Sequence, residues 1–333
     1  MSGVRCTSNI HSNRIKLFAA LLAGVLVCGT FTGCGRVVDN DYDSMMKSDQ
    51  FNPMAAAQES VDRENSFAHD LCLPEDTNAA NVSLPTSGLF DLGNRYTLYG
   101  SGLTTRVFPA STTKIMTALV ALKHGNPGQT ITISENAAYP GADAQRLVLE
   151  PGDTMTLEQA LNYLLVFSAN DCAIAIAENI GGSYDEFVKL MNSEARAIGA
   201  TGTHFTNPHG LHDDDHYTTP YDLYLILNEA VKYEMIRKIL PQSTYNTMFV
   251  GADGSSKSIA VNATDAYLTG DVEAPEGITV LGGKTGTTEP AGHCLIILSQ
   301  NAKEEYYISV VMKTESLEDL YDGMNSLLAQ IPN

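Results

Sequence analysis

The sequence predicts a mixed α/β (α+β) fold in which one antiparallel sheet is packed between helices. Segments typical of strands lie at both ends of the globular part, near residues 88–99 and 280–312, and segments typical of helices fill the middle. Strands from distant parts of a chain meet in one sheet when the helices between them cover its faces. Residues of the AVILMFWYC class make up 44% of the 333 residues, enough for the sizeable core that this fold needs.

The expected elements of the globular part, residues 85–333, follow one another from its first residues. Two short strands, 88–91 and 95–99, surround a Gly-Asn turn. A helix over about 111–124 follows Pro109 and is apolar nearly all round, which predicts a buried central helix. Capping boxes, a Gly-Gly pair and a Thr-Pro pair predict further helices over about 157–167, 171–180, 184–199 and 220–233. Strands near 293–299 and 306–312 complete the sheet.

Residues 1–33 predict an export signal. They contain three basic residues and no acidic one, and residues 17–33 carry no charge at all. The alternative, a retained membrane helix, normally needs a longer apolar run. The segment ends in Phe31-Thr32-Gly33-Cys34, which resembles a bacterial lipobox, so Cys34 is the predicted lipidation site and its lipid would hold the exported protein at the membrane. Ordinary cleavage and secretion is the alternative.

Residues 34–84 predict an acidic tether, because they are polar, rich in Asp and Glu and without clear periodicity. The whole chain has 20 basic and 39 acidic residues, a net charge of −19. Such a chain repels phosphate backbones, so nucleic acid is not an expected partner. A basic surface is equally not expected to hold this protein against an anionic membrane.

The first motif that can carry chemistry is Ser111-Thr112-Thr113-Lys114. A serine and a lysine three residues apart share one face of a helix, so the amine can reach the hydroxyl. The hydroxyl is a weak nucleophile until a base takes its proton. Lysine serves as that base only when neutral, which burial and nearby positive charge favour. The same spacing in residues 44–47 falls in the tether and is set aside.

The second motif, Ser168-Ala169-Asn170, lies between two apolar helical segments. A second hydroxyl can relay protons, and an amide can hold a substrate carbonyl. Residues 134–136 show the same spacing, and in either place the serine and asparagine can simply cap a helix. The helix-loop-helix position after the apolar run 161–167 favours Ser168 and Asn170 as site residues.

The third motif is Gly-Gly-Lys-Thr-Gly-Thr at 282–287. Lys284, Thr285 and Thr287 would place an ammonium and two hydroxyls at the edge of a strand, where they can bind a carboxylate. Glycines such as Gly286 allow a substrate backbone to approach closely. A Gly-rich turn with an exposed lysine is the alternative for this motif taken alone.

Together, and in this order, the three motifs resemble those of the active-site serine penicillin-binding enzymes. The likeness is strongest to the low-molecular-mass D-alanyl-D-alanine carboxypeptidases, and residues 108–118, 207–211 and 291–295 add to it. It covers about residues 85–315. The resemblance implies a transpeptidase or β-lactamase-like fold with an all-helical subdomain beside the sheet, and residues 85–333 as the catalytic domain. We expect neither a cofactor nor a metal.

The resemblance also implies catalytic roles. Ser111 would attack the carbonyl between two D-alanines and form an acyl-enzyme, with Lys114 as its general base. Ser168 and Asn170 would relay protons and hold the substrate amide. Water would then release the shortened peptide. The expected substrates are peptidoglycan stem peptides ending in D-Ala-D-Ala, and β-lactams would act as inhibitors that acylate Ser111.

Substrate binding is implied for the third motif. Lys284 and Thr285 would bind the terminal carboxylate, with Gly286 and Thr287 beside them. The backbone N–H groups of Ser111 and Thr287 would form the oxyanion hole.

Two departures from the family pattern lie around the second motif. Ala169 stands where the family usually has glycine, and its methyl group is tolerable unless that backbone needs a positive φ. Cys172 lies near the motif, and we interpret it as small buried core.

Other functions remain open from the sequence. A class A β-lactamase would need a glutamate where Tyr224 precedes Leu227-Asn228. A DD-endopeptidase or a lipoprotein that binds wall peptide or β-lactam without turnover would keep the same motifs. The four histidines at 204, 209, 212 and 216 lie near acidic residues, but their spacing lacks known metal signatures, so we interpret this stretch as a solvated loop.

Overall fold

The computed structural model describes residues 84, 86–141 and 144–332. The predicted export signal, the lipidation site Cys34 and all of the predicted tether except Leu84 lie outside the described residues. Within the described part, no helix is both long enough and apolar enough to cross a lipid bilayer.

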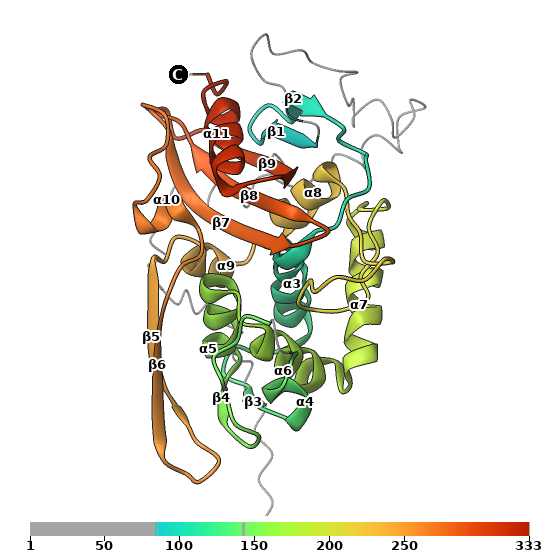
Figure 1. Ribbon diagram of the computed structural model, residues 1–333, viewed down its shortest axis with the longest axis vertical. Helices are drawn as coiled ribbons and strands as arrows, with labels where there is room; N and C mark the ends of the chain where they lie inside the picture. Colours follow the sequence, from blue (N-terminus) through green and yellow to red (C-terminus); the bar gives the residue numbers. More distant parts are fainter. Residues whose placement is uncertain (1–83, 85, 142–143, 333) are drawn as a thin grey trace, which may run out of the picture. The chain divides into compact units, whose positions relative to one another are not determined.

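A five-stranded antiparallel sheet forms one half of the described domain (Figure 1). Its order is β2-β1-β9-β8-β7, so the two N-terminal strands pair with the last strand of the chain. The strands are β1 (Ser87–Asp91), β2 (Tyr96–Ser101), β7 (Thr279–Thr288), β8 (Gly292–Gln300) and β9 (Tyr306–Thr314). The predicted sheet built from both ends of the domain is confirmed.

Helices cover both faces of this sheet. Helix α11 (Leu317–Leu328) packs on one face, and α8 (Pro220–Ala230) packs on the other. Neighbouring residues of β8 therefore belong to different cores: Leu295 and Ile297 pack with α11, whereas Ile296 packs with the main core. Burial on both faces explains why β8 is a continuous apolar run and not an alternating one.

The other half is built around α3 (Lys114–His124), whose first eight residues are buried. Helices α6 (Asn170–Gly181) and α7 (Tyr184–Ala197) pack against it, and α5 (Leu157–Asn162) packs against α6. The central helix predicted over 111–124 is confirmed, with the 3-10 helix η2 (Ala110–Thr113) as its first turn. The helix predicted to end at 167 finishes as the π-helical turn η3 (Tyr163–Phe167). The predicted helix 220–233 ends at Ala230, and α9 (Glu234–Ile239) follows it.

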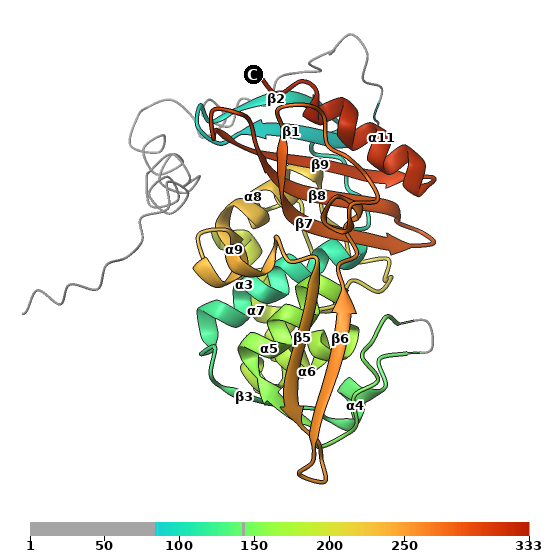
Figure 2. The same cartoon turned by 90° about the vertical axis from the view of Figure 1, so that its left-hand side faces the viewer.

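The helical half also carries a four-stranded sheet of order β3-β4-β5-β6, which the expectation of an all-helical subdomain did not include. Its members are β3 (Thr130–Thr132), β4 (Thr154–Thr156), β5 (Thr244–Val250) and β6 (Ser256–Asn262), and the β5–β6 hairpin runs along the helices (Figure 2). Two of these strands are only three residues long, and the hairpin is largely exposed. Neither feature produces an apolar periodicity that sequence inspection can detect. The short helices α4 (Glu135–Ala138) and α10 (Ala266–Thr269) complete the described elements.

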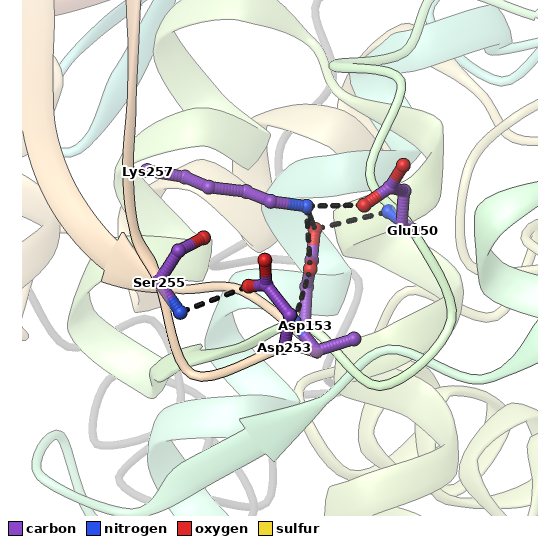
Figure 3. Close-up of polar contacts among 6 residues, drawn as sticks. Glu150, Asp153, Asp253, Ser255 and Lys257 are labelled. Carbon is purple, nitrogen blue, oxygen red and sulfur yellow. Dashed lines mark hydrogen bonds and ion pairs between the residues drawn. The ribbon is translucent and has the colours of Figure 1, made fainter.

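A polar cluster fixes the tip of this hairpin (Figure 3). The buried carboxylate of Asp153 accepts hydrogen bonds from the backbone N–H of Ala252 at 2.9 Å and of Glu150 at 3.0 Å. The ammonium of Lys257 lies 3.0 Å from the same carboxylate and also contacts Glu150. The cluster therefore ties the hairpin to the turn that precedes β4.

Candidate active site

The predicted nucleophile and its base lie side by side at the junction of the two halves. Ser111 is in η2, and Lys114 is the first residue of α3. The Nζ of Lys114 lies 2.8 Å from the Oγ of Ser111 and donates to the carbonyl of His209 at 2.6 Å. Lys114 is completely buried, and burial holds its pKa well below the usual value, helped by the positive charge of Lys284 and opposed by Asp171. A neutral amine next to a hydroxyl is the arrangement of a general base.

A buried histidine holds the turn that carries Ser111. The Nδ1 of His216 accepts from the backbone N–H of Thr206 at 3.0 Å, so its proton lies on Nε2. That Nε2 donates to the Oγ of Thr113 at 2.8 Å, and the same hydroxyl donates to the carbonyl of Ala110. Burial lowers the pKa of His216 to about 3, so the ring stays neutral and keeps this tautomer. The bond therefore fixes the residue directly before Lys114.

The loop whose carbonyl accepts the hydrogen bond from Lys114 is equally constrained. The Nδ1 of His209 accepts from the N–H of Leu211 at 3.1 Å, and its Nε2 lies 3.2 Å from the hydroxyl of Tyr184. Gly210 has a φ of +87°, and a Cβ there would lie 1.8 Å from the carbonyl oxygen of Ala110. Only glycine fits this approach between the loop and η2.

The interpretation of the histidine stretch as a solvated loop was wrong for two of its members. His209 and His216 are 8% and 2% exposed, and both belong to the support of the Ser111 turn. Burial lowers the pKa of His209 to about 3 as well. No group of three or more His, Cys, Asp or Glu side chains within the described ranges is placed to hold a metal ion. The only sequence signal for the role of His209 was the resemblance of residues 207–211 to the family, and His216 lies outside that stretch.

The second motif lies where η3 ends and α6 begins. Ser168 is buried and has the left-handed φ of 68°, which terminates the π-helical turn. Ala169 has a φ of −63° and a ψ of 116°, so its backbone needs no positive φ and the methyl group is accommodated. Asn170 donates its N–H to the carbonyl of Gln145 at 2.8 Å. The Oδ1 of Asn170 is buried without a hydrogen-bond partner among the described residues, so it remains free to accept a hydrogen bond.

The competing copy of this motif is a helix cap. Ser134 accepts from the N–H of Ala137 at the start of α4, and Asn136 donates to Glu178. Both η3 and α6 pack against α3, which brings Ser168 and Asn170 toward Lys114. No hydrogen bond among the described residues joins the side chain of Ser168 to Ser111.

The third motif lies in β7, the edge strand of the large sheet. Lys284 is 1% exposed, so the alternative of an exposed turn is wrong. Burial lowers the pKa of Lys284 to about 7, and the negative charge of Asp265 opposes that shift. Asp265 is itself buried, which raises its pKa to about 6. The hydroxyl of Thr285 is fixed by a 2.6 Å hydrogen bond with that of Thr264.

A glycine lets β7 pass directly in front of the nucleophile. A Cβ on Gly286 would lie 2.8 Å from the backbone nitrogen of Ser111 and 2.9 Å from the carbonyl oxygen of Pro109. These distances are shorter than normal carbon contacts, so the strand and η2 can approach this closely only at glycine. Thr287 follows on the strand, with its hydroxyl 3.1 Å from Nδ1 of His293. The first and third motifs are therefore in direct contact.

Comparison with known proteins agrees with this geometry. Residues 88–316 match the family model described as D-alanyl-D-alanine carboxypeptidase, Peptidase_S11. The protein belongs to this family. Its fold is that of the penicillin-binding DD-peptidases, as the solved structures below also show.

Two curated relatives are 33% and 28% identical to the chain over the aligned residues. The D-alanyl-D-alanine carboxypeptidase DacF of Bacillus subtilis is 33% identical over 250 residues, which are 74% of this chain and 58% of DacF. The D-alanyl-D-alanine carboxypeptidase of Streptomyces sp. K15 is 28% identical over 232 residues, 67% of this chain and 78% of that protein. The chain thus spans somewhat more than half the length of DacF.

Two solved structures have the same fold. The crystal structure of the Streptomyces K15 DD-transpeptidase matches with a TM-score of 0.66 and 26% identity, over 75% of this chain and 95% of that one. The D-alanyl-D-alanine carboxypeptidase DacD from Francisella tularensis matches with a TM-score of 0.65 and 26% identity, over 75% of this chain and 71% of that one.

Proposed function

We propose that the protein is a serine-type D-alanyl-D-alanine carboxypeptidase, a hydrolase that acts on the cell wall. The observation that carries the proposal is the buried amine of Lys114, 2.8 Å from the hydroxyl of Ser111, beside an edge strand that bears a second buried lysine. The base is in contact with the nucleophile, and Gly286 brings the strand with the second lysine against the same turn. Family membership and the names of the relatives support the same activity.

The chemistry would proceed through an acyl-enzyme. Lys114 takes the proton of Ser111 while Oγ attacks the carbonyl between the two terminal D-alanines. The tetrahedral oxyanion is held by backbone N–H groups of Ser111 and Thr287. Collapse breaks the peptide bond, and a proton relayed through Ser168 leaves with the amine of D-alanine. Water then attacks the ester, which releases the shortened peptide and restores the hydroxyl.

The remaining groups would position the substrate. Asn170 donates its side-chain amide to, and accepts from, the peptide groups next to the attacked carbonyl. Lys284 and Thr285 bind the terminal carboxylate, and Gly286 lets the substrate backbone lie against β7. β-Lactams, which carry a carboxylate next to a strained amide, would enter the same path and acylate Ser111.

The experiment is intact mass of the protein after incubation with penicillin, together with release of free D-alanine from a diacyl-Lys-D-Ala-D-Ala peptide. We expect a one-to-one adduct and D-alanine release from the wild type, and neither from Ser111→Ala. Release of D-alanine that survives Ser111→Ala would refute this mechanism. An absent adduct with intact drug and peptide would favour a wall-peptide binding module.

In the sequence pattern, Tyr224 stands where a β-lactamase would have its glutamate, and this side chain packs against the core. Tyr224 in α8 stacks on Phe90 at 4.2 Å between ring centroids, and burial raises its pKa to about 12. A side chain of this kind does not activate the water that would release a β-lactam quickly. We therefore expect the penicillin adduct to persist, whereas consumption of the drug without an adduct would favour the β-lactamase.

We also propose that the enzyme acts outside the cytoplasm, attached to the membrane by a lipid on Cys34 after removal of residues 1–33. The support is the basic segment, the uncharged run and the lipobox-like end of the sequence. Metabolic labelling with a fatty acid should mark the wild type and not Cys34→Ala. Labelling of both, or of neither while the protein is found in the medium, would refute lipidation at this residue.

A further inference from the structure

A buried carboxylate lies beside the proposed carboxylate receptor and has no role in the chemistry described so far. Asp265 is 2% exposed and belongs to none of the three motifs. It directly precedes α10, the short helix that packs against β7, the strand of Lys284. The hydroxyl of the neighbouring Thr264 makes the 2.6 Å hydrogen bond with Thr285. The segment 264–265 is therefore fixed against the two residues that would bind the terminal carboxylate of a substrate.

Helices α10 and α11 hold this carboxylate in place. The Oδ1 of Asp265 caps α10 by accepting a hydrogen bond from the N–H of Tyr267 at 3.1 Å. The hydroxyl of Tyr321 in α11 accepts from the N–H of Ala266 at 2.9 Å, and the rings of the two tyrosines meet edge to face. Tyr267 also donates its hydroxyl to Asn325 of α11 at 2.8 Å. These contacts fix both the backbone and one carboxylate oxygen of Asp265.

The second carboxylate oxygen needs a cation. Oδ2 of Asp265 is buried and has no hydrogen-bond partner among the described residues. A buried carboxylate that lacks donors is costly unless a nearby cation compensates its charge. Lys284 provides that compensation: its charge lowers the pKa of Asp265, and the carboxylate in turn raises the pKa of the lysine. The two buried charges therefore stabilise each other.

The other ionisable groups near this pair do not replace Asp265. Burial keeps the amine of Lys114 neutral, so it is not a second cation for the carboxylate. Asp171 acts on Lys114 and not on the receptor lysine. Burial raises the pKa of Tyr321 to about 12 and that of Tyr267 above its usual value, so both phenols stay neutral near pH 7. The negative charge that acts on the receptor is that of Asp265.

The order of the two pKa values determines when this carboxylate matters. Burial raises the pKa of Asp265 to about 6 and lowers that of Lys284 to about 7. Above pH 6 the carboxyl group is mostly ionised, and this is the range in which the lysine begins to lose its proton. Below pH 6 the carboxyl group becomes neutral, but the lysine is charged there without help. The negative charge is thus present over the pH range in which the ammonium would otherwise be lost.

We propose that Asp265 is a positioning residue of the carboxylate receptor. Its buried negative charge keeps Lys284 protonated, so that the ammonium can hold the terminal carboxylate of a substrate. Asp265 acts through the lysine and not by contact with the substrate. This inference rests on the proposed carboxypeptidase function and adds to it a residue that lies outside all three motifs.

The test compares the wild type with Asp265→Asn, which keeps the size of the side chain and a cap for α10. Release of D-alanine from diacyl-Lys-D-Ala-D-Ala is measured from pH 5 to pH 9. Loss of a neighbouring opposite charge lowers the pKa of a lysine by about one unit or more. The alkaline fall of kcat/KM should therefore begin about one pH unit lower in the variant. The two proteins should differ little at pH 5 and about tenfold at pH 9.

Two further variants separate the charge from its structural surroundings. Asp271→Asn removes an exposed carboxylate from the same segment and should keep the wild-type profile. Asp265→Ser also caps a helix and should give the same shift as Asp265→Asn, which keeps the test open if the asparagine variant does not fold. A loss of kcat/KM that is equal at every pH would show a purely structural role and overturn the proposal. So would a wild-type profile in both variants of Asp265.

A titration of Lys284 itself makes the test independent of turnover. In the full chain labelled with isotope-enriched lysine, the Cε resonance of Lys284 is identified by its absence from Lys284→Arg and is followed with pH. Its midpoint should fall by about one pH unit in Asp265→Asn and stay unchanged in Asp271→Asn. If the wild type releases no D-alanine, the proposed function fails while this titration still decides the role of Asp265. Equal midpoints in the wild type and Asp265→Asn would overturn that role and leave the carboxypeptidase activity standing.

Discussion

The charge of Lys284 should set the upper pH limit of the reaction. Burial lowers the pKa of this lysine to about 7, and only the charged form holds a carboxylate. The quantity kcat/KM reports ionisations of the free enzyme. About half of the molecules carry the charge at pH 7, and about one in a hundred carries it at pH 9. We therefore expect kcat/KM for a peptide with a free terminal carboxylate to fall about fiftyfold between these values.

The assay is release of D-alanine from diacyl-Lys-D-Ala-D-Ala across that range. Lys284→Arg supplies a guanidinium that stays charged throughout, so its kcat/KM should be lower at pH 7 yet level up to pH 9. Lys189→Arg, an exchange at an exposed lysine, should keep the wild-type fall. A wild-type profile that stays level to pH 9 would refute the assignment. So would a fall that persists unchanged in Lys284→Arg.

Three further predictions concern the supports of the site. His216→Phe removes the donor to Thr113 and should slow acylation by a chromogenic β-lactam about tenfold. His216→Gln, which keeps a donor, should be closer to wild type. Equal rates in all three proteins would contradict the positioning role of His216. Gly210→Ala should lower the free energy of unfolding in urea by about 2 kcal/mol or more and abolish acylation, because the new Cβ meets the carbonyl of Ala110. An unchanged midpoint of the urea transition would contradict this packing. Lys257→Met leaves the buried carboxylate of Asp153 without its cation and should lower the midpoint of thermal unfolding, with acylation at pH 7 unaffected. No shift relative to Lys189→Met would show that the hairpin cluster contributes nothing.

Sequence reasoning located the chemistry of this site better than its support. Ser111 and Lys114 could be paired in advance because helix geometry fixes residues three apart on one face, whatever surrounds them. The predicted proximity of the two side chains is confirmed, and it depends only on the geometry of one helical turn. The contact of Gly286 with Ser111 depends instead on two elements about 170 residues apart, so only the resemblance to known enzymes indicated it. The roles of all these residues stay predictions until the variants are measured.

The misinterpreted histidines show the limit of local patterns. His209 and His216 lie in a stretch with acidic neighbours at 213–215, which is typical of an exposed loop. Both histidines are buried by tertiary contacts, with Thr113 of η2 and with Tyr184 of α7. The residue pattern within the stretch does not predict these contacts. The four-stranded sheet was missed for the same reason, since its strands are short and their partners are distant.

The two buried lysines are best understood together. Each is removed from water, which lowers both pKa values, and the charge of Lys284 lowers that of Lys114 further. Each also has one acid that opposes the shift, Asp171 for Lys114 and Asp265 for Lys284. Two neighbouring ammonium groups repel each other, so the pair favours a state with one charged and one neutral lysine. The pKa of Lys284 falls to about 7, so this lysine can stay charged, and its charge helps to keep Lys114 neutral. A substrate carboxylate that binds Lys284 therefore stabilises the cation there at the same moment as the neutral base beside Ser111 is needed. Carboxylate recognition and activation of the nucleophile are coupled through one electrostatic interaction, so Lys284→Arg should alter the pH dependence of both.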